Sequence, residues 1–176
     1  MTIDAALFAS TIDVLTPVLL AALAGLLCQH AGVWNVSLEG TMLFGCFAAV
    51  AGSWFTGSAA LGVLAAAVAG TAVALMLAVG SVTLGGDAIV LGIGIDLFAI
   101  AVTSFFLHTV FGVDGAFQDP GLAALSRVDI PGLDQVTILG EVFSGHSALV
   151  YLSWVAVVAL SVLLYRHPVG LRLRGI

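Results

Sequence analysis

Residues 40–86 contain no charged side chain. This run strongly constrains the fold, because a helix crosses a bilayer with about 20 residues and the run is long enough for two crossings. Two aromatic residues lie among turn-forming residues at 53–58, which indicates where the chain reverses. The pattern predicts one span near residues 37–53 and another near 59–82.

Three further apolar runs are long enough to cross a membrane. They lie near residues 14–33, 88–107 and 147–165. Residues 109–146 carry several acidic residues, prolines and glycines, so we expect a water-exposed loop with a short helix near 121–126. The chain is therefore predicted to be all-α, a polytopic integral membrane bundle of about five transmembrane helices that forms a single domain over residues 1–176.

Composition indicates that lipid takes the place of water around this chain. Hydrophobic residues make up 61% of the sequence and charged residues 8%, against roughly 25% charged residues in ordinary globular domains. The net charge is -6 and there is no lysine. Nucleic acid is excluded as a partner, because so few basic residues cannot neutralise a phosphate backbone.

Sequence motifs for bond-making chemistry are absent. No phosphate-binding P-loop, serine nucleophile elbow or zinc-protease motif occurs, so we expect no catalytic residue and no metal or cofactor held by this chain. Cys28 and Cys46 lie in apolar surroundings without metal-ligand spacing, and we expect buried thiols.

The basic residues predict an orientation. Arg166, Arg172 and Arg174 follow the last span directly, and the positive-inside rule places this tail, residues 166–176, in the cytoplasm. Counting back through five spans puts the N-terminus and the 109–146 loop outside.

Two acidic residues, Glu39 and Asp96, interrupt the hydrophobic segments. A carboxylate at the bilayer centre costs at least about 2.5 kcal/mol on insertion scales, so such groups usually face a bundle interior or a wet path. One interpretation is a lining for a transport route, or a proton site. The other is structural: an acid bonded to a neighbouring helix, or Glu39 at the membrane edge near a helix start.

A small residue recurs at every fourth position of the third span, at Gly62, Ala66, Gly70 and Ala74. These residues share one helix face, on which another helix can approach closely. The alternative is that a helix rich in alanine shows such a stripe by chance.

Several segments resemble the permease subunits of bacterial ABC importers for nucleosides and simple sugars, in the branched-chain amino acid/ribose permease superfamily. Residues 16–26 (TPVLLAALAGL) and 31–40 (AGVWNVSLEG) are similar to the family patterns TPxLxAALGGL and AGVxNIGLEG. Residues 89–97 (IVLGIGIDL) carry Asp96 where the family usually has asparagine. Further similarity extends through IPGL, ILG and YL, beginning at residues 130, 138 and 151, to GLRLR at 170–174.

The resemblance implies an assembly in which two permease subunits form a pathway in the lipid bilayer. Two ATPase subunits would bind below and hold the ATP, and an extracytoplasmic solute-binding protein would deliver the substrate. Asn35, Glu39 and Asp96 become candidates near the pathway or its gates. The outer loop becomes a candidate docking surface.

The end of the sequence departs from the family pattern. In the family, GLRLR leads into a cytoplasmic segment that contacts the ATPase, with more helices after it, whereas this chain stops at Ile176. We therefore expect a C-terminally truncated permease or a mis-called reading frame, the alternative being a functional five-helix protein. The chain keeps the coupling-side candidates Arg166, Gly170, Arg172 and Arg174. The implied location is the bacterial inner membrane.

Two other function classes stay open from the residues alone. An ion- or proton-coupled secondary carrier would use Glu39 and Asp96, although the spans show no inverted repeat. A membrane scaffold without transport activity would pack other proteins through the small-residue stripe.

Overall fold

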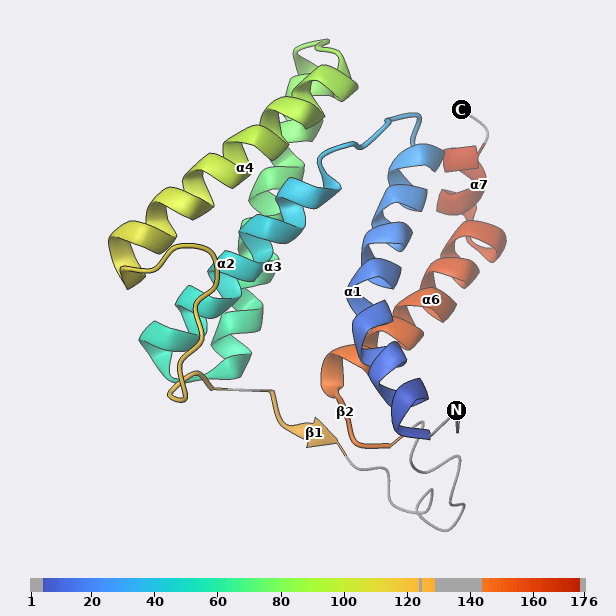
Figure 1. Cartoon of the computed structure of the whole chain (residues 1–176). Coiled ribbons are helices and arrows are strands. Elements are labelled where there is room, and N and C mark those ends of the chain that lie inside the picture. The colour runs from blue at the N-terminus through green and yellow to red at the C-terminus, as the bar shows by residue number, and fades with distance from the viewer. Residues whose placement is uncertain (1–4, 124, 129–143, 175–176) are drawn as a thin grey trace. The chain divides into compact units, whose positions relative to one another are not determined.

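The computed structural model describes residues 5–123, 125–128 and 144–174. Its five long helices are α1 (Ala5–His30), α2 (Leu38–Thr56), α3 (Ala59–Ala78), α4 (Ala88–Phe111) and α6 (Ala148–Arg166). The smaller elements are the π-helical turn η1 (Val79–Thr83), β1 (Arg127–Val128), β2 (His146–Ser147) and α7 (Pro168–Arg174) (Figure 1). By length and composition, each of the five long helices can cross a membrane, with η1 extending the third to Thr83. The predicted all-α, polytopic fold class is confirmed.

The chain divides into two compact units. The central unit is residues 32–124 and holds α2, α3, η1 and α4. The terminal unit combines residues 1–31 with 125–176, and so brings together α1, β1, β2, α6 and α7.

In the central unit, α3 runs back antiparallel to α2, and α4 reverses direction again (Figure 1). Gly57 ends α2 in the left-handed conformation with φ 64°, and its N–H donates to the Ser53 carbonyl. Glycine suits this position because it has no Cβ to oppose positive φ. Asp87 begins α4 by accepting hydrogen bonds from the N–H groups of Ile89 and Val90.

The buried core of the central unit is small. Val73, Leu77 and Ile95 are buried, and Phe44 and Leu91 pack against them. Most other large apolar side chains of the long helices are exposed. Such a surface would be unfavourable in water, which agrees with lipid as the solvent for these helices.

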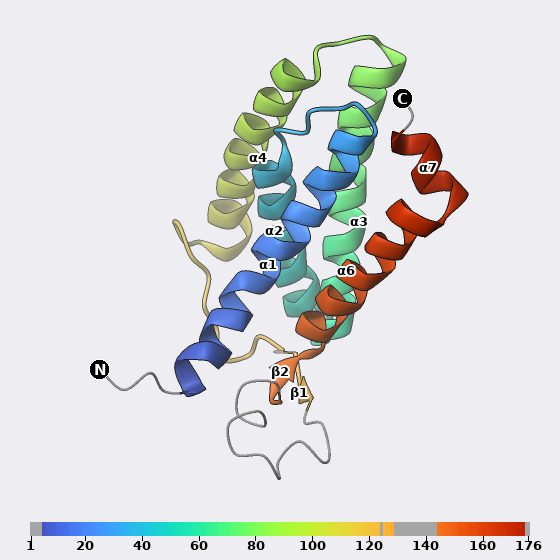
Figure 2. The same cartoon turned by 90° about the vertical axis from the view of Figure 1, so that its right-hand side faces the viewer.

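In the terminal unit, α1 packs beside α6 (Figures 1 and 2). The two short strands pair antiparallel at the start of α6, with Arg127 opposite Ser147. After α6, the chain turns at His167 and α7 folds back (Figure 2). Gly170 is buried, and a Cβ added there would lie 2.5 Å from the Leu164 Cα.

Several helix bounds differ from the expected ones. The first helix begins at Ala5 rather than near residue 14, so Pro17 lies in its interior instead of near its start. The expected short helix near 121–126 is wrong: the described residues there form a turn followed by β1. The tail contains α7, which the hydropathy pattern did not predict, because a helix of 7 residues leaves no hydropathy signal of its own.

Candidate functional site

The three candidate pathway residues, Asn35, Glu39 and Asp96, belong to the central unit, and two of them shape the start of α2. The Asn35 Oδ1 accepts a hydrogen bond from the Ser37 N–H at 3.0 Å and another from the Ser37 hydroxyl at 2.8 Å. This is an Asx-type turn, in which a side chain takes the place of a backbone acceptor. Ser37, the residue before α2, is fully buried.

Asp96 reaches the same place from α4. Its Oδ1 accepts a hydrogen bond of 2.7 Å from the Gly40 N–H, in the first turn of α2. The first N–H groups of a helix have no partner within the helix, so a carboxylate oxygen here satisfies one of them. The candidate acid of the fourth span is therefore bonded to a neighbouring helix.

Glu39 lies between these contacts in sequence but its side chain is exposed. It is the second residue of α2, where a negative charge interacts favourably with the helix dipole. The side chains of Asn35 and Asp96 thus both accept hydrogen bonds from backbone N–H groups at the start of α2. The Glu39 side chain is exposed on the surface of this unit.

The crossing of α2 and α4 is close because of glycines. A Cβ added at Gly40 would lie 3.1 Å from the Ala99 Cβ. A Cβ added at Gly92 would lie 3.1 Å from both the Ser37 nitrogen and the Val36 Cβ. Both distances are shorter than ordinary van der Waals contact, so neither position has room for a larger side chain.

The small-residue stripe of α3 meets α2 within this chain. A Cβ on Gly62 would lie 2.7 Å from the Ala49 carbonyl oxygen, and one on Gly70 would lie 3.7 Å from the Thr41 methyl. The Ala66 carbonyl oxygen lies 3.9 Å from the Cβ position of Gly45. Ala74, the last member of the stripe, is exposed.

The α2 side of this contact also consists of small residues that the sequence reasoning missed. A Cβ on Gly52 would lie 2.9 Å from the Ala65 Cβ. Gly45, Ala49 and Ser53 are spaced by four residues, as the stripe on α3 is. This spacing was the signal that could have identified the partner face.

A groove of about 370 Å³ lies between α2, α4 and the segment after α4. Cys46, Phe47, Thr103, Ser104 and Phe117 are among its lining residues. The Thr103 hydroxyl donates to the Ala99 carbonyl at 2.6 Å, which satisfies it within α4. The lining is mainly apolar and suits an apolar occupant.

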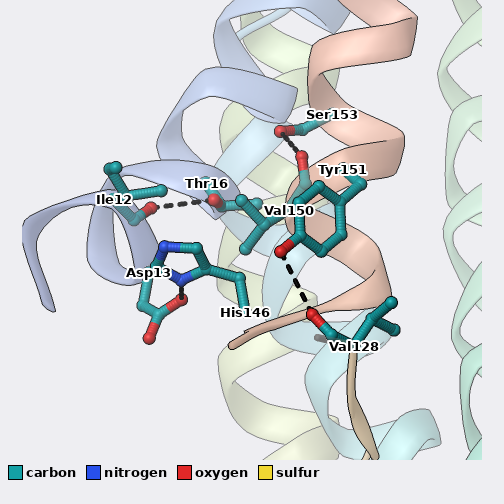
Figure 3. Close-up of polar contacts among 8 residues, drawn as sticks. All are labelled: Ile12, Asp13, Thr16, Val128, His146, Val150, Tyr151 and Ser153. Atoms are coloured by element: carbon teal, nitrogen blue, oxygen red, sulfur yellow. Dashed lines mark hydrogen bonds and ion pairs between the residues drawn. The ribbon is translucent and has the colours of Figure 1, made fainter. Parts of the chain in front are cut away.

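In the terminal unit, the main polar contact joins α1 to β2. The His146 Nδ1 lies 2.7 Å from the Asp13 Oδ1, and the two side chains point toward one another (Figure 3). His146 is 2% exposed and Asp13 is 49% exposed. The Tyr151 hydroxyl also donates to the Val128 carbonyl at 3.2 Å, which ties α6 to β1.

Next to this contact is a cavity of about 360 Å³. Its polar lining includes Asp13, Thr16, Arg127 and Ser147. This group could not be predicted from the sequence, because Asp13 and His146 lie 133 positions apart and carry no shared local motif.

The coupling-side candidates lie at the end of the terminal unit. Arg166 ends α6, while Gly170, Arg172 and Arg174 belong to α7. The side chains of Arg166 and Arg172 are exposed. They are therefore available to partners or to lipid headgroups on whichever side of the membrane they lie.

Comparison with known protein families matches residues 7–176 to the permease component of the branched-chain amino acid transport system. This match covers nearly all of the chain. The chain belongs to this permease family. The membership expected from the motifs at residues 16–40 and 89–97 is confirmed, and the protein is a multi-pass membrane protein of that family.

Curated relatives of this permease are transporter subunits. The guanosine ABC transporter permease protein NupQ of Bacillus subtilis is 30% identical over 95% of this chain and 54% of its own length. The nucleoside ABC transporter permease protein NupC of Lactococcus lactis is 29% identical, over 92% of this chain and 52% of its own. The putative glucose ABC transporter permease protein TsgC13 of Haloferax volcanii is 27% identical, over 98% of this chain and 52% of its own length.

The chain spans about half the length of these curated relatives. No solved structure matches it closely.

Proposed function

We propose that this chain forms part of the transmembrane pathway of an ABC importer for nucleosides or simple sugars. The observation that carries the proposal is the family match over residues 7–176. The three relatives support the substrate class, since two are named for guanosine or nucleosides and one for glucose.

The proposed assembly contains an ABC ATPase subunit, a second permease subunit and an extracytoplasmic solute-binding protein. The chain itself is not an enzyme in this proposal and holds no cofactor; ATP is bound by the ATPase subunit. Transport follows from alternating access, because the ATP-loaded ATPase binds one arrangement of the permease helices better than the other and so shifts their populations.

The proposed location is the bacterial inner membrane, with the N-terminus outside and the C-terminus in the cytoplasm. The arginines after α6 support this orientation. It places the starts of α2 and α4, with Asn35, Glu39 and Asp96, toward the cytoplasmic side. Arg166 and α7 lie on that side as well, where an ATPase subunit binds.

Uptake measurements test the proposal. We expect cells that carry the gene with its neighbouring transporter genes to accumulate radiolabelled guanosine or glucose, and a deletion of this gene to abolish that accumulation. Replacing the P-loop lysine of the partner ATPase should have the same effect, since this chain has no P-loop of its own.

Two results would contradict the proposal. One is uptake that continues without the ATPase and follows a pH gradient, which indicates a secondary carrier. The other is purification of the tagged chain from its native membrane without an ABC ATPase or a binding protein.

A further inference from the structure

The helix α2 begins without a cap from its own N-cap residue. In the described part of the chain, the Ser37 side chain makes no capping bond to α2. Its hydroxyl donates instead to the Asn35 Oδ1 at 2.8 Å. A helix that starts this way leaves its first N–H groups in need of acceptors from elsewhere.

Asp96 supplies one such acceptor from another helix. Its Oδ1 lies 2.7 Å from the Gly40 nitrogen, and the two residues are 56 positions apart. Gly40 is the third residue of α2. The N–H at this position ordinarily donates a hydrogen bond to the side chain of the N-cap residue. The contact therefore does the work of an N-cap while joining α4 to α2.

The backbone around this contact is built for close approach. A Cβ on Gly40 would lie 2.6 Å from the Asp96 Oδ1 and 3.0 Å from the Asp96 Cα. A Cβ on Gly92, one turn earlier on α4, would lie 3.1 Å from the Ser37 nitrogen. Gly94, by contrast, has no atom within 4 Å of its Cβ position. Of the two glycines in α4, only Gly92, which faces the start of α2, lacks space for a side chain.

The location of the contact matters because the preceding backbone is not helical. Asp96 is the ninth residue of α4, which places it about 12 Å along the helix from its start. The residues before α2 run beside Gly92, the fifth residue of α4, about 6 Å along that helix. In the proposed membrane topology this lies within the span, where unsatisfied backbone groups are costly. Non-helical backbone is tolerated at such depth only where protein buries it or water reaches it.

We propose that Asp96 is a positioning residue that caps α2 from α4 and holds residues 35–40 against α4. What it supplies is an acceptor oxygen of fixed position. It does not carry protons or bind the substrate. An asparagine oxygen at residue 96 can accept the same hydrogen bond, whereas leucine cannot. Only the uptake part of the test below rests on the proposed function.

Hydrogen exchange of the Gly40 amide tests the cap directly. The full chain, labelled with ¹⁵N-glycine and held in lipid nanodiscs, is compared with Asp96→Asn and Asp96→Leu. We expect slow exchange at Gly40 to persist in Asp96→Asn. In Asp96→Leu it should be faster by about tenfold or more, as for loss of a hydrogen bond to a charged group. The amides of Gly62 and Gly70 serve as internal references and should not change.

A second pair of variants leaves Asp96 in place. Gly92→Ala should push the segment before α2 away from α4 and speed exchange at Gly40, whereas Gly94→Ala, in open space on the same helix, should not. The proposal is overturned if Asp96→Leu leaves Gly40 exchange unchanged, or if Asp96→Asn exchanges as fast as Asp96→Leu.

Uptake of radiolabelled guanosine or glucose separates positioning from proton or substrate chemistry. Asp96→Asn should keep the rate and pH profile of the natural chain, while Asp96→Leu should lose most uptake. Loss of uptake in Asp96→Asn with Gly40 still protected would overturn the positioning role. Absence of uptake in the natural chain would instead count against the proposed function, and the exchange result would then decide the role of Asp96 by itself.

Discussion

The contact between Asp13 and His146 shows how one polar pair can organise the terminal unit. A buried imidazole needs a hydrogen-bond partner, because an unsatisfied polar group in an apolar environment costs about 1–3 kcal/mol. Asp13, which lies within α1, provides that partner: its Oδ1 is 2.7 Å from the His146 Nδ1. The pair thereby fixes where β2, and hence the start of α6, lies along α1.

A double-mutant cycle measures this contact. We expect Asp13→Asn and His146→Gln each to lower the free energy of unfolding, and the two changes together to cost less than their sum. The expected coupling energy is between about 0.5 and 3 kcal/mol, as for residues in direct contact. Denaturation in mixed micelles gives the values. Glu39→Gln, an exposed carboxylate of the central unit, is the control. Additive effects of Asp13→Asn and His146→Gln would contradict the role given to the pair.

At the scale of elements, hydropathy located the five long helices because lipid requires about 20 consecutive apolar residues in each span. It misplaced the start of α1, because Asp13 interrupts the apolar pattern although the helix continues through it. Hydropathy also missed η1 and α7. Both elements are short, and each packs closely at a glycine, Gly80 against Leu91 and Gly170 against Leu164, which hydropathy does not report.

The candidate site was predictable in part for the same reason. The motif at residues 31–40 singled out Asn35 and Glu39, and hydropathy singled out Asp96 as an acid inside a span. The bond from Gly40 to Asp96 could not be read from the sequence, because it depends on how two helices cross. The exposure of Glu39 could not be read from the sequence either, because α2 is so uniformly apolar that its apolar residues do not mark one face of the helix clearly.

The α2–α3 contact can be tested at Gly62. We expect Gly62→Val to destabilise the central unit by about 1–3 kcal/mol, because the added atoms would meet the Ala49 carbonyl and the Ser53 side chain. Ala74→Val adds apolar volume at an exposed position of the same stripe and should change stability by less than about 0.5 kcal/mol. Thermal unfolding in detergent compares the two. Equal effects would show that Gly62 does not pack as described.

At the scale of the whole molecule, the membrane orientation can be tested by labelling single cysteines. In a background with Cys28→Ala and Cys46→Ala, Gln118→Cys lies after α4 and Leu84→Cys lies between η1 and α4; both positions are exposed. We expect an impermeant maleimide to label Gln118→Cys in intact spheroplasts, and Leu84→Cys only after the membrane is opened. The reverse pattern would invert the proposed topology and place Arg166 and α7 outside.

The division of the chain into two units has a consequence for its synthesis. The central unit is one continuous stretch, so its three long helices can pack as soon as they leave the insertion machinery. The terminal unit joins segments from either side of the central unit, so α1 enters the membrane before the central helices and its partner α6 after them. At about 5–20 residues per second, α1 waits on the order of ten seconds before α6 is complete. Throughout that interval Asp13 lies in a newly inserted helix without its hydrogen-bond partner His146. We therefore expect a membrane chaperone or insertase to contact α1 during this time.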